Sequence, residues 1–132
     1  MAINLGIFDQ IFKRKKEVTS KDLKVWTQVQ DDPVFLPGPE PFDKYGIAWN
    51  QIIRYRGRYY AYYHGATLPP MQGWCTCVAV STDLVRWKKY PKNPILPPKS
   101  SSGILVHDGK HFRLYVMCID DRRVDVYLPR AR

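Results

Sequence analysis

The sequence lacks long hydrophobic runs and has few cysteines. No apolar stretch approaches the roughly 20 residues needed to span a bilayer, so we expect no membrane partner. In residues 1–19 the charges follow the apolar stretch, whereas a secretory signal peptide carries them before it. Of the three cysteines, Cys75 and Cys77 lie two apart in a predicted strand, where they share a face without the geometry for a disulfide. The expected location is therefore the reducing cytoplasm.

Motifs for several chemistries are also missing. The chain has no Gly-rich phosphate loop, no zinc-ligand spacing and no pair of histidines at helical separation. The Cys75-x-Cys77 spacing matches neither a redox motif nor a zinc motif. We therefore expect no cofactor and no metal.

The charge is strongly positive, with 21 Lys and Arg against 12 Asp and Glu and a formal net charge of +9. The only tight basic cluster is Lys-Arg-Lys-Lys at 13–16, which we interpret as the solvated end of an N-terminal segment. Binding of nucleic acid or an anionic surface through this cluster is an alternative that we do not favour. Steep salt dependence of binding would support it.

The composition favours a packed, strand-rich structure. Hydrophobic residues make up 45% of the chain and aromatic residues 14%, which is enough for a core and suits β-sheet. A length of 132 residues predicts a single domain.

Two sequence motifs each occur twice in the chain. The run from Ser20 to Trp26 returns 61 residues later as the run from Ser81 to Trp87, in the pattern Ser-x-Asp-Leu-x-x-Trp. Residues 56–63 return 52 residues later at 108–115, each copy beginning around a Gly turn. Repeats of this length indicate one supersecondary unit used more than once.

The repeated units are predicted to form short antiparallel strands. Runs of β-branched and aromatic residues are bounded by Gly and Pro, and Arg56-Gly57 and Asp108-Gly109 favour hairpin turns. The predicted strands are residues 25–29, 50–55, 58–64, 76–81, 87–90, 104–106, 112–118 and 124–128.

Four such strands per unit are typical of a propeller blade. We therefore predict an all-β fold, a partial β-propeller domain over residues 19–132. It has a complete four-stranded blade at about 49–97 and a partial blade at about 101–129, and residues 25–29 are the outer strand of a preceding blade. Residues 1–18 form an N-terminal extension whose apolar spacing permits a short helix.

The first copy carries an insertion between residues 35 and 50 that the second copy lacks. Insertions on one face of a repeat protein often build the binding face. Glu40 and Asp43 are the only carboxylates in this loop. A carboxylate pair can act as acid and base in glycoside cleavage, which makes these two residues the catalytic candidates. The competing interpretation is that Glu40 is solvated and Asp43 forms a turn.

Residues that recur in both copies are expected to be structural, as with Asp22 and Asp83 in a turn. Residues that differ between copies are the candidates for binding. Trp49 and Trp74 offer flat faces to sugar rings, or pack between blades. Asn50 and Gln51 can bond sugar hydroxyls, or satisfy backbone groups. His64 can donate to a ligand or transfer a proton, or it is a core histidine. Together with Glu40 and Asp43, the candidate site is Trp49, Asn50, Gln51, His64 and Trp74.

The duplicated Ser-x-Asp-Leu-x-x-Trp phrase, the Asn93-Pro94-Ile95-Leu96 run and the Arg58–Gly65 strand resemble the five-bladed β-propeller glycosidase superfamily. That superfamily includes glycoside hydrolase family 43 and the levansucrase/invertase and mannoside phosphorylase groups. The resemblance covers about residues 19–128 and implies a glycoside-hydrolysing or glycoside-binding domain with carbohydrate as its ligand. Since five blades need about 200–250 residues, the chain corresponds to roughly two C-terminal blades.

An incomplete propeller has exposed edge strands, which invite pairing with another chain. We therefore expect self-association, or assembly with a partner that supplies complementary blades. The alternative to a hydrolase domain is a non-catalytic remnant that binds a sugar or a protein. Binding without turnover of aryl glycosides would favour this alternative.

Overall fold

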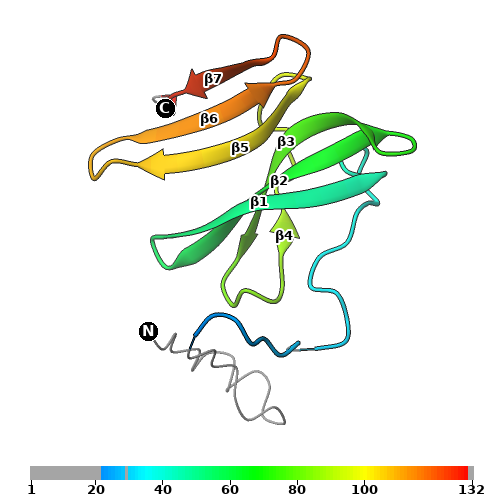
Figure 1. Ribbon diagram of the computed structural model, residues 1–132, viewed down its shortest axis with the longest axis vertical. Coiled ribbons are helices and arrows are strands. Elements are labelled where there is room, and N and C mark those ends of the chain that lie inside the picture. The colour runs from blue at the N-terminus through cyan, green and yellow to red at the C-terminus, as the bar shows by residue number, and fades with distance from the viewer. Residues whose placement is uncertain (1–21, 29, 131–132) are drawn as a thin grey trace. The chain divides into compact units, whose positions relative to one another are not determined.

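A computed structural model describes residues 22–28 and 30–130 (Figure 1). The chain divides into two compact units, Met1–Val34 and Phe35–Arg132, which are treated separately. The helix suggested for residues 1–18 lies outside the described residues. Within the described residues, no helix is long and apolar enough to cross a membrane.

Unit 2 consists of two antiparallel sheets, so the all-β prediction is confirmed. The first sheet has the order β1-β2-β3-β4 and the second the order β5-β6-β7 (Figure 1). The bounds are β1 Gly46–Tyr55, β2 Arg58–Leu68, β3 Gln72–Ser81, β4 Lys88–Lys89, β5 Ser100–His107, β6 Phe112–Cys118 and β7 Arg123–Tyr127. The predicted four-stranded antiparallel unit is thus confirmed in the first sheet, and the second sheet has three strands.

The hairpin of β1 and β2 closes through Arg56 and Gly57. Both residues have positive φ, 48° and 76°, which is the backbone that a two-residue turn between twisted strands requires. Tyr55 pairs with Arg58 on either side of the turn. A bulge between Trp49 and Gln51 leaves Asn50 without a partner in the ladder.

One face of the first sheet forms the hydrophobic core. Tyr63 and Cys77 are fully buried on it and pair with each other across β2 and β3. Aromatic side chains cover this face: the Phe35 ring lies 5.0 Å from that of Tyr63, and the Trp87 ring lies 4.8 Å from that of Trp49. The segment that precedes β1 therefore acts as a lid on the core.

The opposite face of the first sheet contacts the second sheet. Gln51 Nε2 donates to Leu105 O at 2.9 Å, and Leu105 N donates back to Gln51 Oε1 at 2.7 Å. Thr76 Oγ1 donates to Ser100 O at 2.9 Å. The sheets approach closely here, since a Cβ on Gly103 would lie 2.8 Å from Thr76 Cγ2. These side-chain to backbone bonds satisfy polar groups along the free edge of β5.

The repeated Ser-x-Asp-Leu-x-x-Trp phrase forms the same turn twice, as predicted. In each copy the Asp carboxylate accepts hydrogen bonds from backbone N–H groups two and three residues on. The following Leu has positive φ, 59° at Leu23 and 65° at Leu84. The Trp indole N–H donates to that Leu carbonyl, at 2.9 Å from Trp26 and 3.2 Å from Trp87.

The strand predicted at residues 25–29 is wrong where the structure describes it. Residues 25–28 follow the Asp22 turn but form no ladder. The alternation there is local, whereas a strand needs a neighbouring strand to receive its hydrogen bonds. No described residue supplies that neighbour.

Candidate functional site

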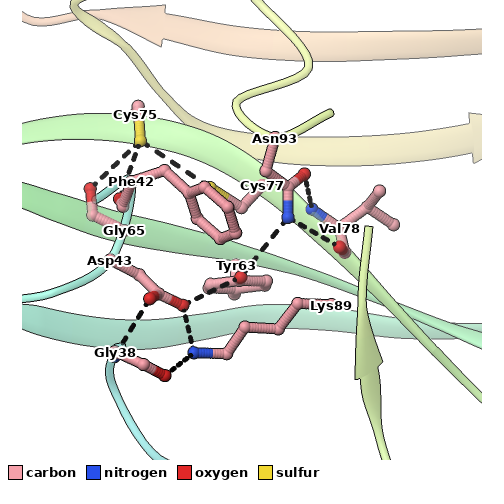
Figure 2. A network of polar contacts seen from close by, with 10 residues as sticks. All are labelled: Gly38, Phe42, Asp43, Tyr63, Gly65, Cys75, Cys77, Val78, Lys89 and Asn93. Carbon is pink, nitrogen blue, oxygen red and sulfur yellow. Dashed lines mark hydrogen bonds and ion pairs between the residues drawn. The ribbon is translucent and has the colours of Figure 1, made fainter. Parts of the chain in front are cut away.

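The sequence-predicted site residues separate onto the two faces of the first sheet. Asp43 lies in the core, at the centre of the polar network in Figure 2. Its side chain is fully buried, and Oδ1 accepts from Gly38 N at 3.0 Å. Oδ2 accepts from the Tyr63 hydroxyl at 3.1 Å and lies 2.6 Å from Lys89 Nζ. Both carboxylate oxygens are therefore committed within the protein.

The loop before β1 is shaped to bring Asp43 inward. Gly38, at a φ of 64°, donates its N–H to the Asp43 carbonyl at 3.2 Å as well as to the carboxylate. Lys89, on β4, reaches the same loop, and its Nζ donates to Gly38 O at 2.7 Å. A buried ion pair is tolerated only when hydrogen bonds complete it. The pair of Asp43 and Lys89 meets that condition and fixes the loop to the sheet.

Asn93 and two thiols extend the network (Figure 2). Asn93 Nδ2 donates to the Tyr63 hydroxyl at 3.4 Å, and its amide also bonds both backbone groups of Val78. Burial raises the pKa of Tyr63, and the nearby Cys77 and Asp43 raise it further. The Cys75 thiol donates to two carbonyls, Phe42 O at 3.3 Å and Gly65 O at 3.4 Å.

This network has the properties of a structural element. The hydrogen bond with Cys75 raises the pKa of Cys77, and burial adds to that effect, so Cys77 stays a neutral thiol. Among the described residues, no buried side-chain nitrogen or oxygen lacks a partner. A network that is fully satisfied and buried stiffens a fold.

Glu40 lies in the same loop as Asp43, but it is on the protein surface and not in the core. It is exposed and lines a shallow depression of about 460 Å³ together with Phe42, Thr67 and Asn93. Its backbone carbonyl accepts from Asp43 N at 3.3 Å. Within the described residues its carboxylate forms no hydrogen bond or ion pair. Glu40 and Asp43 thus do not form a pair of carboxylates that face one cleft.

A second polar cluster lies on the opposite face, around His64 of β2. Its Nδ1 lies 2.7 Å from Ser101 Oγ, and its Nε2 contacts both Asn50 Oδ1 and Ser102 Oγ, the latter at 3.2 Å. The Trp74 ring lies 5.6 Å from the imidazole, at an angle of 90°. We call Asn50, His64, Trp74, Ser101 and Ser102 the His64 cluster.

The protonation of His64 follows from its surroundings. Burial lowers its pKa, so the ring is neutral at neutral pH. Because the Asn50 carbonyl oxygen can only accept, Nε2 carries the proton and Nδ1 accepts from the Ser101 hydroxyl. The imidazole is therefore held between β1 and β5 in one tautomer.

Two bulges create this arrangement. The bulge in β1 turns Asn50 out of its ladder, and the register of β5 is interrupted between Ser101 and Ile104. Ser102 lies in this second bulge with a φ of 56°. Asn50 is exposed, and His64 and Ser102 are half-buried. The cluster therefore presents amide and hydroxyl groups to solvent beside an indole ring.

The other binding candidates have structural partners. The Trp49 ring packs against Phe35, 5.1 Å away, and against Trp87 in the core. Gln51 bonds the backbone of Leu105. The structure thus brings together Asn50, His64 and Trp74, and it places Trp49, Gln51 and Asp43 in other contacts.

Sequence reasoning missed the two serines and Lys89. Ser101 and Ser102 stand one repeat offset of 52 residues after Trp49 and Asn50. The signal that was available was their polarity just before the strand predicted at residues 104–106. No group of residues suited to hold a metal ion occurs in the part of the chain that the structure describes.

Comparisons with known proteins identify no relative of this chain. No family model matches the chain, and no curated protein and no solved structure matches it.

Proposed function

We propose that this chain binds carbohydrate through the His64 cluster and does not hydrolyse it alone. The observation that carries the proposal is the position of His64, whose two ring nitrogens contact side chains of both sheets while Asn50 remains exposed. Such a junction offers several hydrogen-bonding groups within reach of one ligand.

The chemistry of the cluster suits a hydroxylated, neutral ligand. Asn50 offers an amide that both donates and accepts, and the Ser102 hydroxyl does the same. Trp74 adds an apolar ring of the kind that packs on the C–H face of a sugar. The cluster itself contains no charged group, since His64 is neutral, which favours a sugar over an anion.

Binding is favoured over hydrolysis by the positions of the carboxylates. Glycosidases use two carboxyl groups about 5–9.5 Å apart on either side of the bond that is cleaved. Asp43 is bonded to Lys89 and Tyr63 in the core, and the His64 cluster holds no carboxylate. Hydrolysis at this site would require carboxylates from another chain or segment.

The glycosidase-type origin of the chain is supported by its repeat. The Asp-Leu-x-x-Trp turn occurs twice with the same hydrogen bonds, at Asp22 and at Asp83. The four-stranded sheet and the three-stranded sheet match the sizes of one complete and one partial blade. We infer that a five-bladed propeller is the architecture from which these sheets derive.

The test is a titration of the purified chain with a panel of neutral oligosaccharides by calorimetry, alongside an assay with aryl glycosides. We expect at least one sugar to bind, Asn50→Ala to weaken it at least about tenfold, because about 1.4 kcal/mol of hydrogen bonding is lost, and no turnover. The matched control is Thr82→Ala, an exposed polar residue away from the cluster. Absence of binding across the panel, or equal binding by Asn50→Ala, would reject the proposal.

A further inference from the structure

We propose that two copies of this chain associate through the outer face of the second sheet, sheet against sheet. The outer face is the side of β5, β6 and β7 that points away from the first sheet. Its apolar residues are Ile104, Val106, Tyr115, Met117, Val124 and Val126.

These side chains form a continuous patch. Ile104 pairs with Tyr115 across β5 and β6, and Tyr115 pairs with Val126 across β6 and β7. Met117 and Val124 form the next cross-strand pair. Their exposed fractions run from 40% at Tyr115 to 67% at Val124. Residues directly opposite in an antiparallel sheet lie on one face, so the exposed apolar surface is unbroken.

The last strand of the second sheet carries its apolar residues on the outer face. Val124 and Val126, 67% and 54% exposed, lie there, whereas Asp125 pairs with the fully buried Val116 of the inner face. An antiparallel sheet with one solvated face normally turns its polar residues to water. The reversed pattern in β7 indicates that a second layer covers the outer face.

The first sheet shows what such a layer does. Its side that bears Ala61 is covered by aromatic residues of the same chain, Phe35 and Trp87 among them, and Ala61 is fully buried. The repeat offset of 52 residues equates Tyr63, which is fully buried on that side, with Tyr115, which is 40% exposed. No described residue covers Ile104 and Tyr115 in the same way.

The size of the patch fits a dimer. Its exposed fractions correspond to an apolar surface on the order of 600 Å², the upper end of what monomers expose. Ile119, 47% exposed, extends it at the end of β6. A standard interface buries about 800 Å² on each partner, and the apolar patch with a polar border approaches that size.

Charge favours a second copy as the occupant. A chain with a net charge of +9 repels itself unless the contacting surfaces are locally neutral. Among the outer-face residues of β5, β6 and β7, Arg113 is the one cation, and it is paired with Asp108. Two such faces meet without facing an unpaired cation of the strands, and a two-fold axis makes one face complementary to itself.

The experiment is the molar mass of the full chain by analytical ultracentrifugation over a wide concentration range. We expect a monomer–dimer equilibrium for the wild type, a monomer for Val126→Lys, and wild-type behaviour for Leu68→Lys, a control residue 55% exposed outside the outer face. Val126→Thr keeps the strand preference and should weaken the dimer at least about tenfold. Circular dichroism checks that each variant is folded.

A wild type that stays monomeric throughout would overturn the proposal, as would a Val126→Lys variant that dimerises like the wild type. Masses that grow beyond a dimer would also overturn it, because they indicate open-ended strand addition at the β7 edge. The inference is independent of sugar binding. Val126→Lys should bind sugar like the wild type, so failure of one proposal is distinguishable from failure of the other.

Discussion

Asp43 and Lys89 form an ion pair of 2.6 Å that joins the loop before β1 to β4. Lys89 is 16% exposed and Asp43 is fully buried, so the pair is shielded from water. Asp43, which the sequence suggested as a catalytic residue, therefore has a structural role: it anchors β4 at the edge of the first sheet.

Removing the carboxylate should therefore cost stability. In Asp43→Ala the Lys89 ammonium loses its counter-charge, and Gly38 N–H and the Tyr63 hydroxyl lose their acceptor. We expect a loss of about 3–5 kcal/mol in the free energy of unfolding, measured with urea. Asp120→Ala is the control, because its pair with Lys99 is 73% and 55% exposed and is worth at most about 1 kcal/mol. Equal losses in the two variants would contradict this role for Asp43.

Gly65 of β2 is a second point at which the loop before β1 packs closely against the first sheet. A Cβ on Gly65 would meet the carbonyl oxygen of Phe42 and lie 2.9 Å from Asp43 Cβ. We expect Gly65→Ala to lower the free energy of unfolding by about 1–3 kcal/mol, because backbone must move. Gly57→Ala, in open space but with positive φ, should cost only about 1 kcal/mol. Thermal unfolding compares them, and a smaller effect at Gly65 would count against the close approach.

The pKa of His64 gives stability a pH dependence with a defined sign. Burial lowers the pKa in the folded state, so the unfolded chain takes up the proton more readily. The contribution of neutral His64 is complete above the unfolded pKa of about 6.5 and declines as the pH falls below that value. Urea unfolding at a series of pH values should show a decline that His64→Gln reduces. Parallel declines in the two proteins would rule this contribution out.

Asp83 gives a pH dependence in the acid range. Burial tends to raise its pKa, but hydrogen bonds from Arg86 N and Val85 N and from the Arg86 guanidinium hold it well below the usual range. Its contribution is therefore complete above the unfolded pKa of about 3.9 and is lost as the pH falls below that value toward the lower pKa of the folded state. Asp83→Asn should cost about 1–3 kcal/mol at neutral pH, and the difference should shrink in acid. Asp22→Asn, in the exposed copy of the turn, is the comparison and should cost less.

The strands were predictable where the signal is local. The Arg56-Gly57 turn fixed one hairpin, and β6 spans residues 112–118 as predicted from alternation around Asp108-Gly109. The start of β1 at Gly46, four residues before the predicted Asn50, was not predictable, because Gly46 and Ile47 pair with Ala66 and Gly65 far along the chain. Strand ends that depend on a distant partner carry no local signal.

The faces through which the two sheets contact each other could not be predicted from the sequence either. The repeat equates Tyr62 with Leu114, and both line one cavity of about 570 Å³. Equivalent faces of the two sheets therefore meet, which no local pattern in either copy records. This contact leaves the outer face of the second sheet uncovered by described residues.

The candidate site was predictable only in part. Asn50 and His64 were candidates because they differ between the two copies of the repeat, and the structure places them in contact. Ser101 and Ser102 join them only because the second sheet docks there, which no local pattern records. Trp49 and Gln51 also differ between the copies, but the bulge between them places Trp49 on the core face and Gln51 on the face toward β5.

The most direct test of carbohydrate binding at the His64 cluster is a ¹H–¹⁵N NMR titration that follows the His64 ring and the Trp74 indole N–H. With a sugar that binds, both signals should shift and saturate together, and Asn50→Ala should weaken the response. If a sugar binds while neither signal moves, or if none of the sugars binds, the assignment of the site is contradicted.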